Sequence, residues 1–308
     1  QKSIAGLAGR TFAWFAVTAV LAVAVGLVFG LVIQPGAGVG VLQVSSDYKP
    51  KDVPGVLDVL FNIVPSNVFQ ALSGAASQTV DGTSVLVPRN GTVLQVIFFA
   101  GLVGFALVKL GEKTANLRKL VGEASETMIQ VTRFVLEFTP IGTFGLIAAL
   151  VGGYGFEQLK PLASFVVALY AACAFHIIVV YGGLLLAHGL NPLKFFRGAA
   201  PAMQVGFVAS SSFAALPLSL RCATDNHGVD RNYAAFAVPL GASIKMDGCG
   251  AIYPALAAGF IAQYTGIELS WSQYLIIALA SVLGSFGTAG VPGTAVIMAT
   301  VVLSAANL

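Results

Sequence analysis

The chain has 308 residues, of which 57% are hydrophobic and only 9% are charged. Because soluble globular domains contain about 25% charged residues, this composition excludes an ordinary water-soluble protein. The net charge of +3 is small, and the basic residues lie in short clusters between apolar runs. That pattern is typical of multi-span membrane proteins and argues against a nucleic-acid-binding surface. The odd number of cysteines argues against a disulfide framework.

Apolar runs that cross about 30 Å of hydrocarbon need about 20 residues. In chain order the clear candidates are Thr11–Ile33, Thr92–Val108, Met128–Val151, Ala163–Ala187 and Asn232–Tyr264. Shorter or interrupted runs are Val56–Leu72, Lys194–Cys222 and Trp271–Asn307.

The basic clusters predict how these runs thread through a membrane. The positive-inside rule places the densest cluster, residues 109–119, in the cytoplasm, and the clusters at residues 2–10 and 194–197 lie on the same side. The first clear span then runs outward and the second runs inward. We therefore expect Val56–Leu72, which lies between them and contains Pro65, to be a partial or surface helix that does not cross.

Two of the interrupted runs have the form of re-entrant hairpins. Lys194–Cys222 has basic residues at both ends and a polar tip at Ser210–Ser212, and Trp271–Asn307 has two apolar arms around Gly287–Gly293. Non-helical backbone at membrane depth is tolerated only where it is buried in protein or lines a cavity. Two such hairpins that enter from opposite faces therefore indicate a binding site between them.

Lys245 and Asp247 interrupt the run Asn232–Tyr264. One charge near the bilayer centre costs about 2.5–3.5 kcal/mol on insertion scales, so two charges followed by Gly248 predict local unwinding, with each charge neutralised by the other or by a bound ion. The alternative is that one or both side chains reach an interface by snorkelling.

The serine tip and a histidine have similar competing interpretations. Ser210–Ser212 offers hydroxyls and free backbone N–H groups to an anion. In an ordinary membrane helix the same hydroxyls would bond to carbonyls one turn back. His176, in the run Ala163–Ala187, is more often a packed histidine than a proton relay.

Several sequence strings carry a family resemblance. They are Ser210–Ser212 with Ala215-Leu216-Pro217, Val238–Ile244 with Met246–Gly248, Gly287–Gly293, Gln34-Pro35-Gly36, Ile63–Asn67 and Pro140–Gly142. In their order along the chain they resemble the dicarboxylate/amino acid:cation symporter family, which is the glutamate transporter family. The resemblance runs over essentially the whole chain and implies that the first two and the last transmembrane helices of the family are absent from it.

The resemblance implies an all-α integral membrane fold in a multi-pass protein of the plasma membrane. It also implies an elevator mechanism, in which a transport domain slides against a scaffold within a homotrimer. The implied segments are a transport-domain helix at 11–33, scaffold helices at 54–110, a scaffold helix at 112–153, a transport-domain helix at 161–190, re-entrant hairpin 1 at 194–225, a broken helix at 230–265 and re-entrant hairpin 2 at 270–308.

Site residues follow from the same resemblance. The implied substrate-binding positions are Ala209, Ser210, Ser211, Ser212, Asp247, Cys249, Gly290 and Val291. The implied cation-binding positions are Thr18, Gly241, Ser243, Lys245, Asp247, Ser285, Phe286 and Thr288. Sodium would be held at Gly241, Ser243, Asp247, Ser285 and Thr288. No cofactor is expected beyond a coupling cation, sodium or a proton.

Departures from the family pattern shape the functional hypothesis. Lys245 stands where sodium-coupled members have Asn, and Phe15 and Ala19 replace a tyrosine and a serine of a sodium site. Cys249 replaces the threonine that binds an acidic substrate side chain, and Ala209 replaces an arginine found in some prokaryotic members. We hypothesise that the Lys245 ammonium takes the place of a sodium ion beside Asp247, which would reduce sodium dependence or leave protons as the coupling ion.

The function expected from this pattern is cation-coupled symport of amino acids or dicarboxylates. The alternatives are a cystine or neutral amino acid carrier of the same family, or an anion channel or non-transporting homologue. An intramembrane hydrolase would need a nucleophile bonded to a base, and no serine motif of that type surrounds Ser211.

Overall fold

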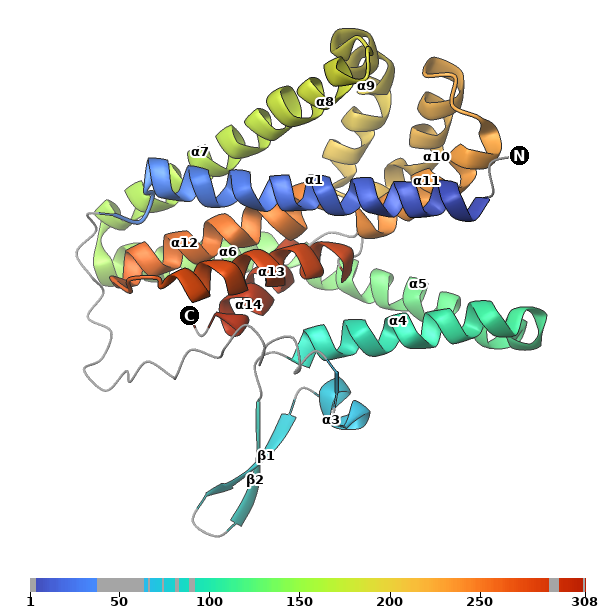
Figure 1. Ribbon diagram of the computed structural model, residues 1–308. Helices are drawn as coiled ribbons and strands as arrows, with labels where there is room; N and C mark the ends of the chain where they lie inside the picture. Colours follow the sequence, from blue (N-terminus) through green and yellow to red (C-terminus); the bar gives the residue numbers. More distant parts are fainter. Residues whose placement is uncertain are drawn as a thin grey trace. The chain divides into compact units, whose positions relative to one another are not determined.

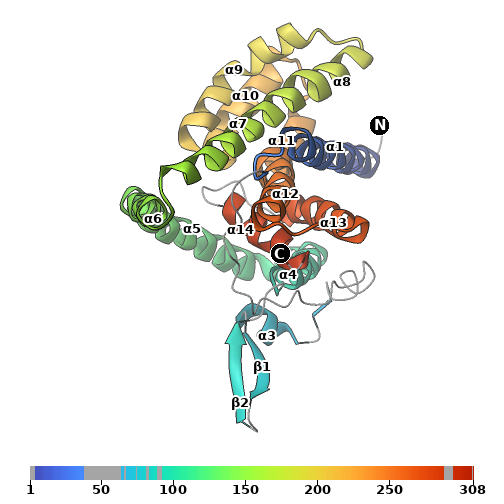
Figure 2. The ribbon, with the colours of Figure 1, turned by 90° about the vertical axis from the view of Figure 1, so that its left-hand side faces the viewer.

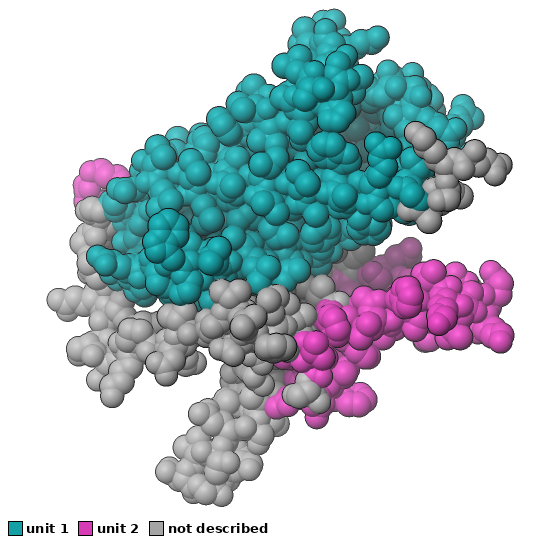
Figure 3. Space-filling model, in the orientation of Figure 1, with its two compact units in different colours: residues 1–54, 161–308 teal, residues 55–160 magenta. Residues whose placement is uncertain are grey.

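The computed structural model describes residues 4–37, 64–65, 67–73, 75–80, 83–88, 92–287, 294–306 and 308. The chain divides into two compact units, one made of residues 1–54 and 161–308 and the other of residues 55–160. Figure 3 colours the first unit teal and the second magenta. This division separates the segments expected in a transport domain from those expected in a scaffold, although the roles of the two units stay predictions.

The unit of residues 55–160 consists mainly of helices. Its elements are α3 (Val68–Ser73), β1 (Ala75–Val80), β2 (Thr83–Pro88), α4 (Thr92–Leu110), the 3-10 turn η1 (Gly111–Thr114), α5 (Ala115–Glu137), α6 (Thr139–Tyr154) and the 3-10 turn η2 (Phe156–Gln158). The strands β1 and β2 pair antiparallel, with Ala75 opposite Pro88 and Val80 opposite Thr83. The prediction of an all-α chain did not include this hairpin, which lies in the polar stretch between two apolar runs.

One predicted helix in this unit is two helices. The expected span Met128–Val151, within the expected scaffold helix at 112–153, is interrupted at Phe138, where α5 has ended and α6 begins with Pro140 in its first turn. A proline is tolerated there because its missing N–H would have no partner inside the helix anyway. Of the expected partial helix Val56–Leu72, only the part from Val64 that ends in α3 lies within the described residues.

The other unit contains the long apolar helices. Its elements are α1 (Ile4–Ile33), α7 (Leu159–Phe175), the π-helical turn η3 (His176–Tyr181), α8 (Gly182–Ala187), α9 (Pro192–Ala209), α10 (Ser212–Arg221), the π-helical turn η4 (Cys222–Asn226), α11 (Arg231–Ile244), the π-helical turn η5 (Asp247–Ile252), α12 (Tyr253–Thr265), α13 (Trp271–Gly287) and α14 (Thr294–Ala305). Within the described residues, two continuous helices are long and apolar enough to cross a membrane, Gly6–Ile33 and Leu159–Ala187.

The core of this unit forms around α12. Ala255, Leu256 and Ala258 are completely buried, and α12 contacts α1, α13 and α14. Figures 1 and 2 show α12 running beside α1 and α13. Small side chains on both sides let these helices approach closely, which is how helices pack in lipid, where the hydrophobic effect does not drive their association.

The helices of each expected hairpin contact one another, and the expected helix break is present. The helices α9 and α10 contact one another across Ser210 and Ser211, and α13 contacts α14. Residues 288–293, at the expected tip of the second hairpin, lie outside the described residues. The interruption predicted at Lys245 is confirmed, because α11 ends at Ile244 and Lys245 and Met246 are non-helical. Whether the hairpins are re-entrant stays a prediction.

Gly26 of α1 gives a direct test of this packing. A Cβ added to Gly26 would lie 2.7 Å from the carbonyl oxygen of Ile252 and 3.1 Å from its Cα, which are backbone atoms that cannot rotate away. We expect Gly26→Ala to destabilise the protein by about 1–3 kcal/mol through overpacking. Gly9→Ala in the same helix, where a Cβ meets nothing within 4 Å, is the control. Thermal unfolding in detergent should separate the two variants, and equal stability would contradict this account of the core.

Candidate functional site

The break between α11 and α12 presents a buried carboxylate. Pro254, in the first turn of α12, has no N–H to bond to the carbonyl of Gly250, and its ring would clash with that carbonyl in a regular helix. The preceding residues form the wider π-helical turn η5, which begins at Asp247. Asp247 is only 5% exposed. This turn contacts α1, α12, α13 and α14, so the carboxylate stands at the centre of its unit.

One oxygen of Asp247 receives three groups. Its Oδ2 atom accepts a hydrogen bond from the Tyr181 hydroxyl at 2.6 Å and lies 3.2 Å from His176 Nε2. The Lys245 ammonium forms an ion pair with the same oxygen. Charge-assisted hydrogen bonds of this kind are about twice as strong as neutral ones. We call these four residues the Asp247 cluster.

His176 and Tyr181 reach the carboxylate because of the turn η3. They stand five residues apart, and the centroids of their rings are 4.7 Å apart in an edge-to-face arrangement. The Lys245 ammonium lies 5.7 Å from the centre of the Tyr181 ring, at a distance that suits a cation–π contact. Since Nε2 faces a carboxylate, which only accepts, we infer that Nε2 carries a proton and donates it to Asp247 Oδ2.

The charges in the cluster balance. The Lys245 ammonium and the Asp247 carboxylate face each other, and Tyr181 and His176 are further hydrogen-bond donors. Taking both charges out of water is costly unless their geometry is good and further hydrogen bonds assist. Two buried acceptor or donor atoms nevertheless have no partner within the described part of the chain, Asp247 Oδ1 and His176 Nδ1. The cluster therefore keeps capacity for one more polar contact.

Some of the expected cation positions gather near this cluster. A Cβ on Gly241 would lie 3.5 Å from the tip of the Phe15 ring and 3.9 Å from Cβ of Lys245, so Gly241 faces Phe15 one turn before the helix break. Ser285 is 1% exposed on α13, a helix that contacts η5, and Phe286 follows it, partly buried. Thr288 lies outside the described residues.

Two expected cation ligands are engaged by their own helices. Thr18 is buried and donates to the carbonyl of Trp14 at 2.8 Å, while Ser243 donates to the carbonyl of Pro239 at 3.0 Å. These bonds to carbonyls one turn back are the ordinary arrangement of hydroxyls in membrane helices. A hydroxyl that donates its proton keeps its oxygen lone pairs, so the cation-ligand role of these two residues stays a prediction.

The serine tip has a clear local role. Ser210 adopts the left-handed conformation, with φ of 48°, and ends α9 directly after Ala209. Ser211 caps α10, because its side chain accepts from the N–H of Ala214 at 3.3 Å. Ser212 is the first residue of α10. The serines are not among the groups bonded to Asp247 Oδ2, and hairpin 1 contacts α11 instead.

The remaining expected substrate positions lie on or near the second hairpin. The Cys249 thiol, in η5, is within hydrogen-bonding contact of the Thr294 side chain at the start of α14. This contact joins the helix break to the second hairpin. Gly290 and Val291 lie outside the described residues.

The sequence analysis missed His176 and Tyr181 as members of the site. At 100° per residue, two positions five apart on an α-helix point about 140° away from each other, so their spacing does not suggest a shared face. Only the π-helical turn brings them together, and such turns are frequent at functional sites. The available signal was the presence of two polar aromatic side chains in an otherwise apolar span.

The ion pair in the cluster predicts an asymmetric response to mutation. Asp247→Asn leaves the Lys245 ammonium, whose side chain is 17% exposed, without its counter-charge and should destabilise the protein by about 3 kcal/mol. The double variant Lys245→Met/Asp247→Asn should regain most of this loss. Glu157→Gln, which breaks the largely exposed Lys160 pair, is the control and should change little. Thermal unfolding measures all three, and a double variant as unstable as Asp247→Asn would refute the pairing.

Substitutions of His176 test the contribution of its hydrogen bond to the stability of the protein. His176→Leu removes the donor and should cost about 1–3 kcal/mol, because the buried Asp247 carboxylate then loses one of its three partners. His176→Gln keeps an N–H at a similar distance along the side chain and should retain most of the stability. If both variants unfold at the same temperature, the hydrogen bond to Asp247 contributes nothing.

Comparisons with known proteins identify the family. The model of the sodium:dicarboxylate symporter family matches residues 1–308. The proton/sodium-glutamate symport protein of Geobacillus stearothermophilus is 30% identical over 305 residues, which covers 96% of this chain and 68% of the relative. The C4-dicarboxylate transport protein 2 of Pseudomonas aeruginosa is 29% identical over 312 residues, covering 99% and 67%. The C4-dicarboxylate transport protein of Rhizobium etli is 31% identical over 303 residues, covering 98% and 66%. This chain therefore belongs to the sodium:dicarboxylate symporter family, whose members are membrane transporters and not enzymes.

Proposed function

We propose that this chain forms the membrane-embedded body of a symporter that couples the entry of an amino acid or a dicarboxylate to a cation. Family membership supports this proposal, as do the relatives named for glutamate and C4-dicarboxylate transport. The apolar composition and the two span-length helices are in keeping with it. The protein acts as a homotrimer in the plasma membrane, and the unit of residues 1–54 and 161–308 moves as an elevator against the other unit.

The Asp247 cluster is the observation that carries the proposal. A buried carboxylate at a helix break is the kind of group that holds a cation inside a transporter. In this chain the Lys245 ammonium is paired with it. A fixed positive charge supplies the attraction that a sodium ion would supply, and it repels a second cation through the same Coulomb interaction. The transporter therefore uses fewer sodium ions per cycle than relatives with Asn at this position, or uses protons.

The substrate is an amino acid or a dicarboxylate. The N-terminus of α10, capped by Ser211, points free N–H groups at a substrate carboxylate. Backbone contacts from Gly290 and Val291 belong to the same proposal. Cys249 offers only a weak donor to a second carboxylate. This favours neutral amino acids or cystine over glutamate as the preferred substrate.

Uptake into proteoliposomes tests the coupling ion. The wild-type protein should accumulate substrate under an imposed sodium or proton gradient with saturable, stereoselective kinetics. Lys245→Asn should raise the Hill coefficient for sodium by about one, because one fixed charge is replaced by one bound ion. Lys245→Arg keeps the charge and serves as the matched control, while Lys160→Asn removes an exposed lysine elsewhere.

Two results would overturn this proposal. Wild-type uptake that is strictly sodium-dependent, with several ions per cycle and no change in Lys245→Asn, would refute the role of Lys245. A current without saturable uptake would instead identify an anion channel of the same family.

A further inference from the structure

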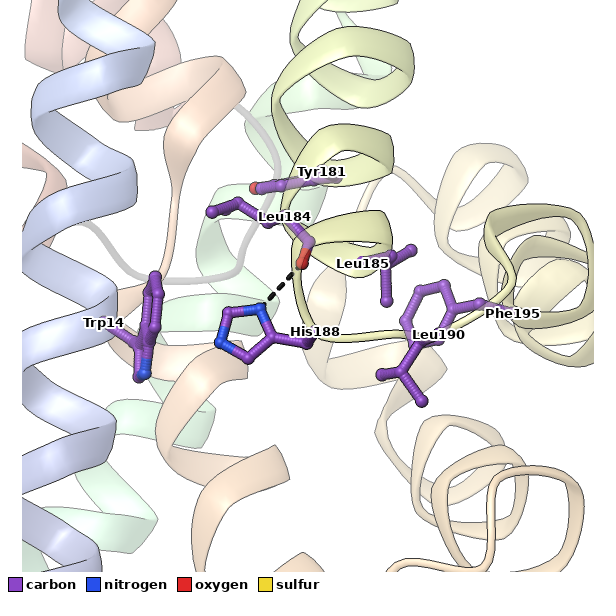
Figure 4. A pocket seen from close by; sticks show the side chains of 7 residues that line it. All are labelled: Trp14, Tyr181, Leu184, Leu185, His188, Leu190 and Phe195. Atoms are coloured by element: carbon purple, nitrogen blue, oxygen red, sulfur yellow. Dashed lines mark hydrogen bonds between the residues drawn. The ribbon is translucent and has the colours of Figure 1, made fainter.

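A hollow lies beside the Asp247 cluster and shares one residue, Tyr181, with it. It has a volume of about 390 Å³, and it lies between α1, the end of the long helix that includes α8, and the start of α9. Figure 4 shows its walls, which are the rings of Trp14, Tyr181 and Phe195, three leucines and His188. A volume of this size is within the range of small-molecule sites.

The walls of this hollow offer almost no polar groups to an occupant. The His188 ring stands edge-to-face with Trp14, with 5.3 Å between the ring centroids. Its Nδ1 atom donates to the carbonyl of Leu184 at 2.7 Å, as the dashed line in Figure 4 marks. A molecule bound in this hollow would therefore contact mainly the hydrocarbon of leucine and aromatic side chains. An aliphatic chain fits such walls better than a polar solute does.

Basic residues border the hollow, and acidic residues are absent from its segments. Residues 4–37 and 159–209 contain no Asp or Glu. Arg10 stands four residues before Trp14, on the same face of α1, and Lys194 directly precedes Phe195. Both basic residues are exposed. The segments that form the hollow therefore carry only positive charge, while Asp225 in η4 and Asp230 at the start of α11 lie on neighbouring elements that contact α9 and α1.

The position of these residues along the helices fixes the leaflet. Tryptophan is enriched at membrane interfaces, and clusters of Lys and Arg mark the cytoplasmic ends of spans. The anionic phospholipids of a cell membrane concentrate in the cytoplasmic leaflet. We propose that this hollow binds an acyl chain of an anionic phospholipid of that leaflet, with the headgroup at Arg10 and Lys194.

Tyr181 links the lipid to the transport site. Its ring forms part of the wall of the hollow, while its hydroxyl donates to Asp247 at 2.6 Å. A bound acyl chain therefore restrains the residue that orients the Asp247 carboxylate. This second half of the inference rests on the proposed cation-coupled function, whereas the lipid site itself does not.

Lipid retention by the purified protein tests the site without any transport measurement. Native mass spectrometry in the presence of phosphatidylglycerol and phosphatidylcholine should show selective retention of phosphatidylglycerol by the wild type. Leu185→Trp fills the hollow and should lower this retention at least about tenfold, since each excluded methylene loses about 0.8 kcal/mol of burial, or roughly a factor of four. Arg10→Gln and Lys194→Gln should each lower the preference for phosphatidylglycerol about fivefold, and Arg10→Lys should not.

Another apolar hollow in the same unit supplies the matched control. It measures about 470 Å³, lies between the same two long helices near Val28 and Phe175, and is lined by apolar side chains. Residues 11–37 and 161–187 contain no Lys or Arg, so this hollow has no basic border. Val28→Trp should leave the retention of phosphatidylglycerol unchanged. Equal retention by wild type and Leu185→Trp, or equal retention of both lipids by the wild type, would overturn the proposal.

Transport in vesicles tests the link through Tyr181. Adding phosphatidylglycerol to phosphatidylcholine vesicles should shift the apparent cation affinity of the wild type and leave that of Leu185→Trp unchanged. A shift of equal size in both proteins would refute the link. If no vesicle shows uptake, the proposed function fails while the retention measurement still decides the lipid site.

Discussion

The rest of this structure depends on keeping the Lys245 ammonium against the Asp247 carboxylate inside an apolar protein. Neither charge is tolerable alone at membrane depth. Their pairing needs a helix that stops at Ile244 and restarts in a π-helical turn. It also needs His176 and Tyr181 as further hydrogen-bond donors to the carboxylate. The glycines of α1 matter for the same reason, because Gly26 lets that helix lie directly against the turn. The ion pair, the broken helix and the close contact of α1 with the turn thus depend on one another.

Much of this arrangement is predictable from the sequence, because it follows from the cost of charge in hydrocarbon. Two charges in the middle of an apolar run predict the helix break, and the serine run predicts the turn between α9 and α10. The partners of Asp247 are not predictable in this way, because a helix of regular period turns His176 and Tyr181 apart. The break at Phe138 and the hairpin of β1 and β2 were also missed, since local turn chemistry there outweighs the apolar periodicity. The ligands expected at Thr288 and Val291 stay predictions.

The cluster also suggests how one family can vary its driving ion while keeping its fold. A lysine side chain can neutralise the carboxylate in place of a bound cation, and this exchange needs no change in the surrounding helices. The three groups on one carboxylate oxygen leave the other oxygen unpartnered within the described residues, so a single further cation or proton has a place to act. Tyr181 connects this place to the hollow between α1, α8 and α9, where we propose that a lipid binds.

Counting the sodium ions bound by the purified protein tests the central claim most directly. Equilibrium binding of radioactive sodium, in the presence of saturating substrate, compares the wild type with Lys245→Asn at equal protein concentration. The account predicts that the wild type binds about one sodium ion fewer than the variant, because the ammonium already neutralises Asp247. Equal numbers of bound sodium ions in the two proteins would contradict it.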